Sequence, residues 1–343
     1  MERLLTFDGK GIYCPKADIH IDPWKKVPRA LITHGHSDHA RWGMGAYLCT
    51  NESVPILKHR LGINNKIQGI PFGESMHING VKFSFHPAGH VIGSAQIRVE
   101  YKDEIWVVSG DYKLADDGIS KAFEPIKCHT FITESTFGLP VYRWENQNRI
   151  FKKVNNWWKK NNSEGRVSVI TAYSLGKAQR LINGLDASIG KIYTHGAIEN
   201  TNKILRDHGH LIQETIHATA NYNFDDYQGN MVICPPSAVN SAWVKKFKDF
   251  RLGIASGWMQ MRGARRRQAA DIGFVLSDHA DWNDLNTAIR ETGAHEIYVT
   301  HGFSRIYSKY LREQGYDAKI VETAFEGEQL EVSTEEEAKQ GES

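Results

Sequence analysis

The chain has 343 residues, and its 42 Lys and Arg residues against 40 Asp and Glu residues leave a formal net charge of +2. Hydrophobic residues make up 41% and charged residues 24%, which excludes a disordered chain and is typical of a globular protein with a buried core. No apolar run approaches the roughly 20 residues that cross a bilayer, so we expect no membrane association. The near-neutral charge neither requires nor excludes a polyanionic partner, and the length favours two domains.

The amino-terminal segment and the cysteines bear on the compartment. The segment "MERLLTFDGKGIYC" lacks the apolar core of a secretory signal, which favours a cytoplasmic protein. The cysteines form no CxxC pair, which predicts reduced, buried thiols. They are Cys14, Cys49, Cys128 and Cys234.

The first 145 residues are predicted to be mostly β-structure. Short segments rich in β-branched and aromatic residues predict strands, several of which end in polar side chains. The predicted strands are 28–33, 81–86, 95–101, 104–110 and 129–135.

Residues 146–265 differ from the preceding part of the chain, because strand-like and helix-like segments alternate there. "NRIFKKVNNWWKKNN" predicts a helix, "RVSVIT" a strand, "SLGKAQRLINGL" a helix and "KIYTH" a strand, which together predict a small parallel α/β unit. Residues 266–330 then contain a predicted helix at 282–292 and a strand in "EIYVTHG". Residues 331–343 are small and charged, and we expect a disordered tail.

The segment "THGHSDHARW" holds four candidate metal ligands within six residues. In an extended chain His34 and His36 point the same way and can bind one ion. Asp38 and His39 follow where we expect the chain to enter a helix, so their side chains suit a second ion. Paired ions about 3.5–4 Å apart are a common device for hydrolysing phosphate esters and amides. The alternatives are a solvent-exposed histidine-rich loop that binds no metal and structural histidines whose hydrogen bonds are satisfied within the fold.

The remaining ligands are expected at the ends of other predicted strands. His90 lies in a glycine-flanked loop, Asp111 follows "WVVSG", and His301 follows "IYVT". One ion would be bound by His34, His36, His90 and Asp111, and the other by Asp38, His39, Asp111 and His301. Nitrogen and oxygen ligands without thiolate fit two divalent ions, Zn²⁺ or Mn²⁺, with Fe²⁺ possible. A second HxH pair, His208 and His210, lies at an expected helix end without a following Asp-His, and we interpret it as non-ligating.

A strand followed by "HGHSDH", then an isolated His, an Asp and a His, resembles the metallo-β-lactamase superfamily. The resemblance implies an α/β fold, a four-layer αββα sandwich with a binuclear metal site at one edge. It also implies that Asp22 of "IHIDPW" orients a metal-binding histidine, although Asp22 could instead be an ordinary turn residue before Pro23.

Three later segments, "TESTFG", "SDHAD" and "THG", resemble the additional motifs of the β-CASP nucleases within that superfamily. This resemblance implies a small α/β β-CASP cap at 146–265, inserted into a metallo-β-lactamase domain made of 1–145 and 266–330. His279 would contact the phosphate or protonate the leaving oxygen, and Glu134 would hydrogen-bond His279 and raise its basicity. The alternatives are a turn-capping carboxylate for Glu134 and a residue beside a helix N-cap for His279.

Basic residues near these motifs are candidate phosphate contacts. They are Arg262, Arg265, Arg266, Arg267, and Lys177 beside Ser174 at a predicted helix start. The lysines that flank Trp157 and Trp158 could contact single-stranded DNA, but an amphipathic helix with Trp in the core is the preferred interpretation.

The segment "SGWMQMRGARRRQAADIGFVLSDHADW" resembles the bacterial ligase-associated DNA exonucleases. This resemblance implies a metal-dependent DNA nuclease of exonuclease type that hydrolyses phosphodiester bonds with a two-metal-activated hydroxide. It also implies repair of DNA alongside an ATP-dependent DNA ligase and a helicase. His301 is the marker typical of RNA-processing β-CASP members, so a ribonuclease is the nearest alternative. A small-molecule metallohydrolase and a non-catalytic nucleic-acid-binding scaffold are further alternatives.

Overall fold

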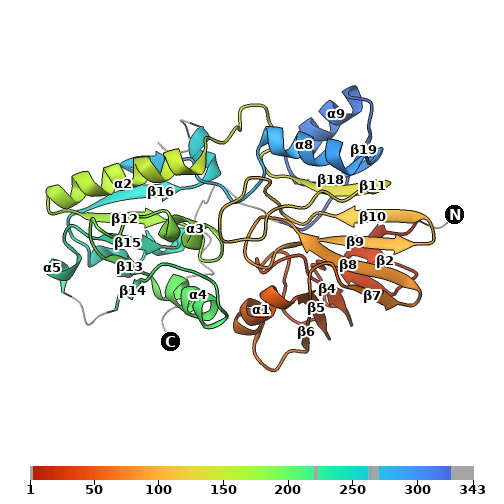
Figure 1. Ribbon diagram of the computed structural model, residues 1–343, viewed down its shortest axis with the longest axis horizontal. Helices are drawn as coiled ribbons and strands as arrows, with labels where there is room; N and C mark the ends of the chain where they lie inside the picture. Colours follow the sequence, from red (N-terminus) through yellow and green to blue (C-terminus); the bar gives the residue numbers. More distant parts are fainter. Residues whose placement is uncertain (1–2, 220–222, 262, 264–269, 326–343) are drawn as a thin grey trace. The chain divides into compact units, whose positions relative to one another are not determined.

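The structure is a computed structural model that describes residues 3–219, 223–261, 263 and 270–325 (Figure 1). The described chain divides into two compact units, one of residues 3–143 and 278–325 and the other from 144 to 277. The names lactamase domain and cap, with their boundaries at 145/146 and 265/266, stay a prediction. The expected tail at 331–343 lies outside the described residues.

The first unit contains two β-sheets. The first sheet has the order β1 (Thr6–Asp8), β2 (Gly11–Cys14), β3 (Ile19–Ile21), β4 (Ala30–Leu31), β5 (Tyr47–Thr50) and β6 (Ile67–Ile70). The second sheet has the order β19 (Asp317–Ile320), β18 (Glu296–Gly302), β11 (Thr130–Ser135), β10 (Glu104–Val108), β9 (Ala95–Tyr101), β8 (Val81–Pro87) and β7 (Ser75–Ile78).

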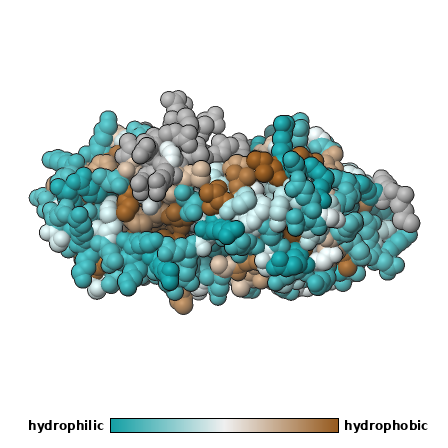
Figure 2. Space-filling view, turned by 90° about the horizontal axis from the view of Figure 1, so that it is seen from above, coloured by the Kyte–Doolittle hydropathy of each residue, from teal (hydrophilic) through white to brown (hydrophobic). Residues whose placement is uncertain are grey.

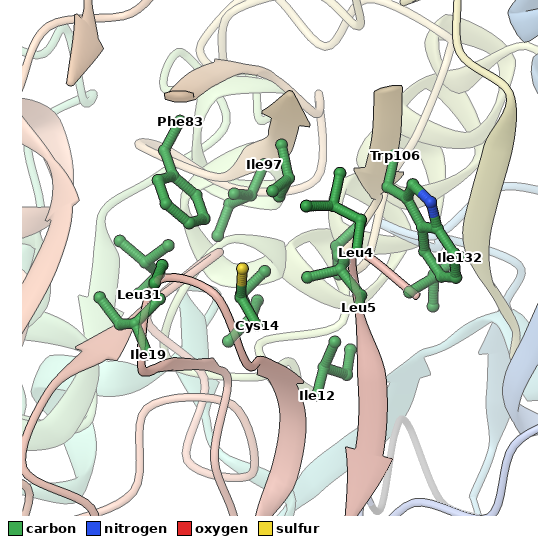
Figure 3. Packing of buried hydrophobic residues seen from close by; sticks show 14 of the residues in the cluster. Leu4, Leu5, Ile12, Cys14, Ile19, Leu31, Phe83, Ile97, Trp106 and Ile132 are labelled. Carbon is green, nitrogen blue, oxygen red and sulfur yellow. The ribbon is translucent and has the colours of Figure 1, made fainter. Parts of the chain in front are cut away.

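One hydrophobic core lies between these two sheets. Ile19 and Leu31 of the first sheet share a buried cluster with Phe83, Ile97 and Trp106 of the second (Figure 3). Side chains alternate along a strand, so β10 sends Trp106 into this core and its neighbour Val107 to the opposite face. Each fully buried Leu, Ile or Phe side chain contributes about 1.5–3 kcal/mol, so this layer is a main source of stability.

Helices cover the outer face of each sheet. α8 (Trp282–Thr292) and α9 (Ser304–Glu313) pack on the second sheet, where Leu285 and Leu311 contact the cluster that contains Val107 (Figure 1). α1 (Val54–Leu61), which follows the short 3₁₀ helix η1 (Asn51–Ser53), packs Leu57 against Tyr47 on the first sheet. The layers are therefore helix, sheet, sheet and helix, as the αββα prediction requires.

Strand direction brings distant segments to one edge of the second sheet. β8 is antiparallel to β9, β9 is antiparallel to β10, and β10, β11 and β18 are parallel. β8, β10, β11 and β18 therefore run in the same direction, and their carboxyl ends meet at the same edge. Each of these ends carries a predicted site residue.

The second unit is built on an entirely parallel sheet. Its order is β14 (Ile216–His217), β13 (Ile192–Thr194), β15 (Met231–Cys234), β12 (Val167–Thr171), β16 (Phe250–Ala255) and β17 (Ile272–Phe274). The intervening helices are α2 (Gln147–Ser163), α3 (Lys177–Asn183), α4 (Gly196–Asp207), α5 (Phe224–Tyr227), α6 (Ala242–Lys245), η2 (Pro236–Ala238) and η3 (Gly257–Gln260). The predicted parallel α/β arrangement of this stretch is confirmed.

The predicted helix whose lysines flank Trp157 and Trp158 is α2, and the burial of its side chains agrees with the amphipathic interpretation. Trp158 is fully buried and donates its indole N–H to the carbonyl of Gly229, at 3.0 Å, whereas Lys159 and Lys160 are exposed.

Hydrophilic residues cover most of the surface seen in Figure 2, with smaller apolar patches among them. Within the described ranges, no helix has both the length and the apolar character needed to span a bilayer. All four cysteines are buried and unpaired.

Candidate metal centre

The segment that carries the HxHxDH motif follows β4 as a compact turn. The amide of Ala40 donates to the carbonyl of His36, at 2.9 Å. The expected entry into a helix after Asp38 is therefore wrong, because residues 37–39 form a turn. The turn still separates the side-chain directions, with His34 facing one group of ligands and His39 facing another.

The first group joins four predicted ligands. The Nδ1 atom of His36 lies 3.1 Å from Nε2 of His34 and 3.1 Å from Nε2 of His90. The Oδ2 atom of Asp111 lies 3.5 Å from Nε2 of His34 and 3.8 Å from Nε2 of His90. Tetrahedral zinc with bonds of about 2.0–2.2 Å separates its ligand atoms by about 3.3–3.6 Å. The four atoms therefore converge as the ligands of one ion would.

The second group shares the carboxylate of Asp111. Its Oδ2 atom lies 3.6 Å from Nε2 of His39, and its Oδ1 atom lies 3.1 Å from Nε2 of His301. Oδ2 of Asp38 lies 3.7 Å from Nε2 of His39, beside this group, and its predicted role as a ligand of the second ion stays a prediction. Asp111 thus stands between two groups of histidines, which is where a bridging ligand belongs.

Buried atoms without partners test whether a cation fits here. Among the described residues, Nε2 of His39, Nε2 of His301 and Oδ1 of Asp111 are buried and make no hydrogen bond. An unsatisfied buried polar atom costs about 1–3 kcal/mol. Divalent ions bound by these atoms would remove that cost, so the donor set fits a metal centre.

Asp22 contacts His39 of the second group through the ring nitrogen that does not face Asp111. Its carboxylate accepts the amide N–H of Thr33 at 2.8 Å and the Thr33 hydroxyl at 2.5 Å. Nδ1 of His39 lies 2.8 Å from Oδ2 of the same carboxylate, which leaves Nε2 to face the metal group. Asp22 has a positive φ of 45°, an uncommon conformation for a residue other than glycine. These contacts place Asp22 against the ring of His39, and its role in orienting a metal-binding histidine stays a prediction.

Gly110 allows the segment that carries Asp111 to approach Thr33, which follows β4 of the other sheet. Gly110 has a φ of +57°, and a Cβ atom added there would lie 2.7 Å from the side chain of Thr33. Any larger residue would push the two loops apart. The glycine of "VVSGD" therefore has a packing reason in addition to its backbone conformation.

The predicted pair of Glu134 and His279 lies beside the first group. Nδ1 of His279 is 2.9 Å from Oε2 of Glu134, and Oε1 of Glu134 accepts the amide N–H of Tyr112 at 2.9 Å. The ring centroid of His279 lies 4.6 Å from that of His90. Nδ1 of His90 lies 2.8 Å from the carbonyl oxygen of Asp278, so the residue before His279 orients a candidate metal ligand.

Burial and charge set the protonation of the histidines. Burial and the nearby His39 lower the pKa of His34 well below its usual value, and burial together with His279 lowers the pKa of His90 to about 3. Both rings are therefore neutral, the form that binds a metal. Although burial disfavours its charged form, the carboxylate of Asp111 helps to raise the pKa of His39 to about 10. A metal ion at His39 would have to displace a proton.

The pKa of His279 moves in the opposite direction from that of His90. Burial disfavours its charged form, but the carboxylates of Glu134 and Asp111 raise its pKa to about 10. His279 is therefore a buried cation at neutral pH. A cation beside the ligand cluster is suited to contact an anionic substrate or to donate a proton.

Two side chains at the centre had no role in the sequence analysis. The ring of Phe325 stacks on that of His39 with centroids 4.3 Å apart and an interplanar angle of 10°. Arg41 donates to the carbonyl of Asp38 at 3.3 Å and to that of Ala324 at 2.6 Å. The arginine that follows the motif was visible in the sequence, but Phe325 carried no local signal.

The predicted phosphate contacts have mixed outcomes. Lys177 is fully buried at the start of α3, with its ammonium 4.6 Å from the centroid of the Tyr173 ring, and Ser174 lies just before it. Their phosphate role stays a prediction. The other four candidates lie outside the described residues: Arg262, Arg265, Arg266 and Arg267. His208 and His210 belong to no potential metal-binding group within the described chain.

Comparison of the sequence with known proteins finds several relatives of this chain. The chain is 27% identical over 313 residues to a protein named Probable DNA ligase from Opitutus terrae, which covers 91% of this chain and 30% of that protein. It is 29% identical over 168 residues to Endoribonuclease YSH1 from Yarrowia lipolytica, covering 46% of this chain and 20% of that protein. It is 30% identical over 167 residues to Cleavage and polyadenylation specificity factor 73 from Drosophila melanogaster, covering 46% and 24%. The chain thus spans less than a third of the length of these relatives.

Structural comparison supports the fold. A crystal structure of a protein of unknown function from Enterococcus faecalis V583 matches with a TM-score of 0.57 and 12% identity, over 87% of this chain and 80% of that chain. No family model matches the sequence. With its histidine and aspartate cluster and these relatives, the chain is similar to proteins of the metallo-β-lactamase and β-CASP type.

Proposed function

We propose that this protein is a metal-dependent nuclease that hydrolyses phosphodiester bonds in DNA. The observation that carries the proposal is the position of Asp111, which lies between two histidine groups while the His279–Glu134 pair adjoins one of them. A hydrolase of small neutral substrates has no evident need for a buried cationic histidine beside the metal ligands.

The chain would bind two divalent ions, zinc or manganese, through the two groups described above. When bound, such ions activate water and stabilise negative charge on a phosphoryl group. His279 would hydrogen-bond a phosphate oxygen and supply the proton that the leaving oxygen takes when the phosphorus–oxygen bond breaks. Glu134 and the Tyr112 amide would hold the His279 ring in place, and Asp22 would hold His39.

Two observations bear on the choice between DNA and RNA. The alignment with the Probable DNA ligase covers 91% of this chain, which supports DNA as the substrate and a role beside a DNA ligase. A repair role that also involves a helicase is implied only by the resemblance to the ligase-associated exonucleases. The relatives named for RNA processing align with 46% of the chain, and His301 is the residue typical of RNA-processing β-CASP members. Residues 146–265 would act as the β-CASP cap. A ribonuclease is therefore the second candidate, and DNA is the one proposed.

The deciding experiment compares matched DNA and RNA oligonucleotides, labelled at either end, single-stranded and duplex, with added Mn²⁺ or Zn²⁺. We expect metal-dependent cleavage of DNA that Asp38→Ala and His39→Ala abolish. Cleavage of RNA alone would replace the DNA proposal with the ribonuclease. Turnover of nitrocefin or a thioester without cleavage of either nucleic acid would assign the centre to small-molecule hydrolysis.

A further inference from the structure

Two exposed apolar side chains lie near the candidate metal-binding turn, residues 34–39, in the sequence. Trp42, three residues after His39, is 69% exposed, and Ile63 is 78% exposed. Fully burying a large apolar side chain contributes about 1.5–3 kcal/mol, so an indole left in water forgoes a stabilising contact. A single exposed apolar residue is ordinary, but the fixed position of this indole and its charged surroundings point to a ligand.

The indole of Trp42 is held by one edge. Its Nε1–H donates to the carbonyl of Leu61 at 3.0 Å, at the carboxyl end of α1. The preceding residue, Arg41, is fixed by its bonds to the carbonyls of Asp38 and Ala324. The ring is therefore oriented by its polar edge while most of its surface stays open to solvent. A pre-oriented aromatic surface loses little conformational entropy on stacking.

The helix whose carboxyl end anchors the indole carries positive charge in its last turn. The last turn of α1 carries Lys58, His59 and Arg60, and Lys66 follows nearby in the chain. Within α1, Val54–Leu61, there is no acidic residue, and the nearby Glu52 pairs with Lys121 at 3.0 Å. An aromatic surface flanked by cations suits the bases and phosphates of a nucleic-acid strand. An acidic or neutral surround would have favoured a protein partner instead.

The carboxyl end of α1, which anchors Trp42, also contacts the candidate metal-binding turn at residues 34–39. Arg60 donates to the carbonyl of Gly35, the residue between His34 and His36. α1 therefore connects directly to the turn that carries the candidate ligands, and Leu61 of the same helix anchors the indole. A strand with one phosphodiester at the ligand cluster would pass close to this basic, aromatic surface.

We propose that Trp42 is a stacking platform for a nucleobase of a single-stranded nucleic-acid substrate, with Lys58 and Lys66 neutralising the adjoining phosphates. The inference rests on the proposed nuclease function and adds a binding residue to that site. Stacking on an aromatic ring is tolerant of base identity, so the platform increases affinity without imposing a sequence preference.

The test uses the full chain with Trp42→Ala and Trp42→Phe. Leu211→Ala is a matched control, because Leu211 is 89% exposed and lies in the other unit. Three quantities are measured: KM and kcat on a single-stranded oligodeoxynucleotide, binding of that oligonucleotide in EDTA by fluorescence anisotropy, and hydrolysis of bis(p-nitrophenyl) phosphate, which has no bases to stack.

For Trp42→Ala we expect KM and the dissociation constant in EDTA to rise about 5- to 150-fold, since stacking contributes about 1–3 kcal/mol per base. Trp42→Phe should restore most of the affinity. Hydrolysis of bis(p-nitrophenyl) phosphate and the behaviour of Leu211→Ala should match the unmodified chain.

Three results would overturn the platform. Unchanged oligonucleotide binding and KM in Trp42→Ala would assign the exposed indole to a protein contact. An equal loss of activity on both substrates would assign Trp42 to the structure of the metal-binding loop. Failure of the unmodified chain to bind or cleave any oligonucleotide, with bis(p-nitrophenyl) phosphate still hydrolysed, would overturn the nuclease proposal and the platform together.

Discussion

The pair formed by Glu134 and His279 gives the sharpest test of the proposed chemistry. In Glu134→Gln a carbonyl oxygen at the Oε1 position can still accept the Tyr112 amide and lies 3.1 Å from His279 Nδ1. The amide group at the Oε2 position cannot accept the shorter, 2.9 Å hydrogen bond, and the negative charge that faces His279 is lost. A hydrogen bond to a charged group contributes about 1.5–3 kcal/mol. At 1.36 kcal/mol for each factor of ten, kcat should fall about 10- to 150-fold. Loss of the negative charge also lowers the pKa of His279.

The assay is steady-state cleavage of a single-stranded oligodeoxynucleotide across a range of pH. KM, metal content and the midpoint of thermal unfolding should stay close to those of the unmodified protein, because Gln preserves the shape of the side chain. His279→Ala and the double variant complete a mutant cycle. If Glu134 acts through His279, the double variant is little worse than His279→Ala alone. A double variant whose loss equals the product of the two single losses would refute this reasoning.

Three further predictions concern the surroundings of the centre. Asp22→Ala leaves Nδ1 of His39 without its partner, so metal affinity should fall about 10- to 100-fold, measured by titration against a chelator; unchanged affinity would contradict the orienting role. Phe325→Ala removes a stacked pair that contributes about 0.5–1.5 kcal/mol, so the midpoint of thermal unfolding should drop by a few degrees while Phe325→Tyr restores it. Burial raises the pKa of Cys49, Cys128 and Cys234 to about 12. A thiol reagent at pH 8 should therefore label the protein rapidly only after unfolding. Fast labelling of the folded chain would show that these thiols are accessible.

The positions of the candidate ligands could be predicted because their signals are local. An HxHxDH run after an apolar strand is visible within ten residues, and Asp111 and His301 each end an apolar strand-like segment. Parallel strands bring their carboxyl ends to one edge, so convergence of these residues followed from strand direction. The layer order could be expected from the family resemblance.

Other features depend on contacts that leave no pattern in the sequence. Short strands such as β1 and β3, of three residues each, offer too few positions for alternation to be recognised. The carbonyl of Asp278 orients His90, and a backbone atom has no sequence signature. Lys177 has the residue type expected at a phosphate site, but burial of the whole α3 start decides its environment. Phe325 reaches His39 only because the two sheets pack face to face.

The order in which the centre can be assembled follows from the strand that ends in His301. His34 and His36 are among the early residues of the chain, whereas β18 pairs with β11 only after most of the chain has been made. A nascent protein that contains the HxHxDH turn but not β18 therefore lacks one of the two strands that pair with β11, and it lacks the histidine that lies 3.1 Å from Oδ1 of Asp111. On the proposed function, hydrolysis would depend on β18, and a nascent chain would not cleave a nucleic acid before β18 has been made.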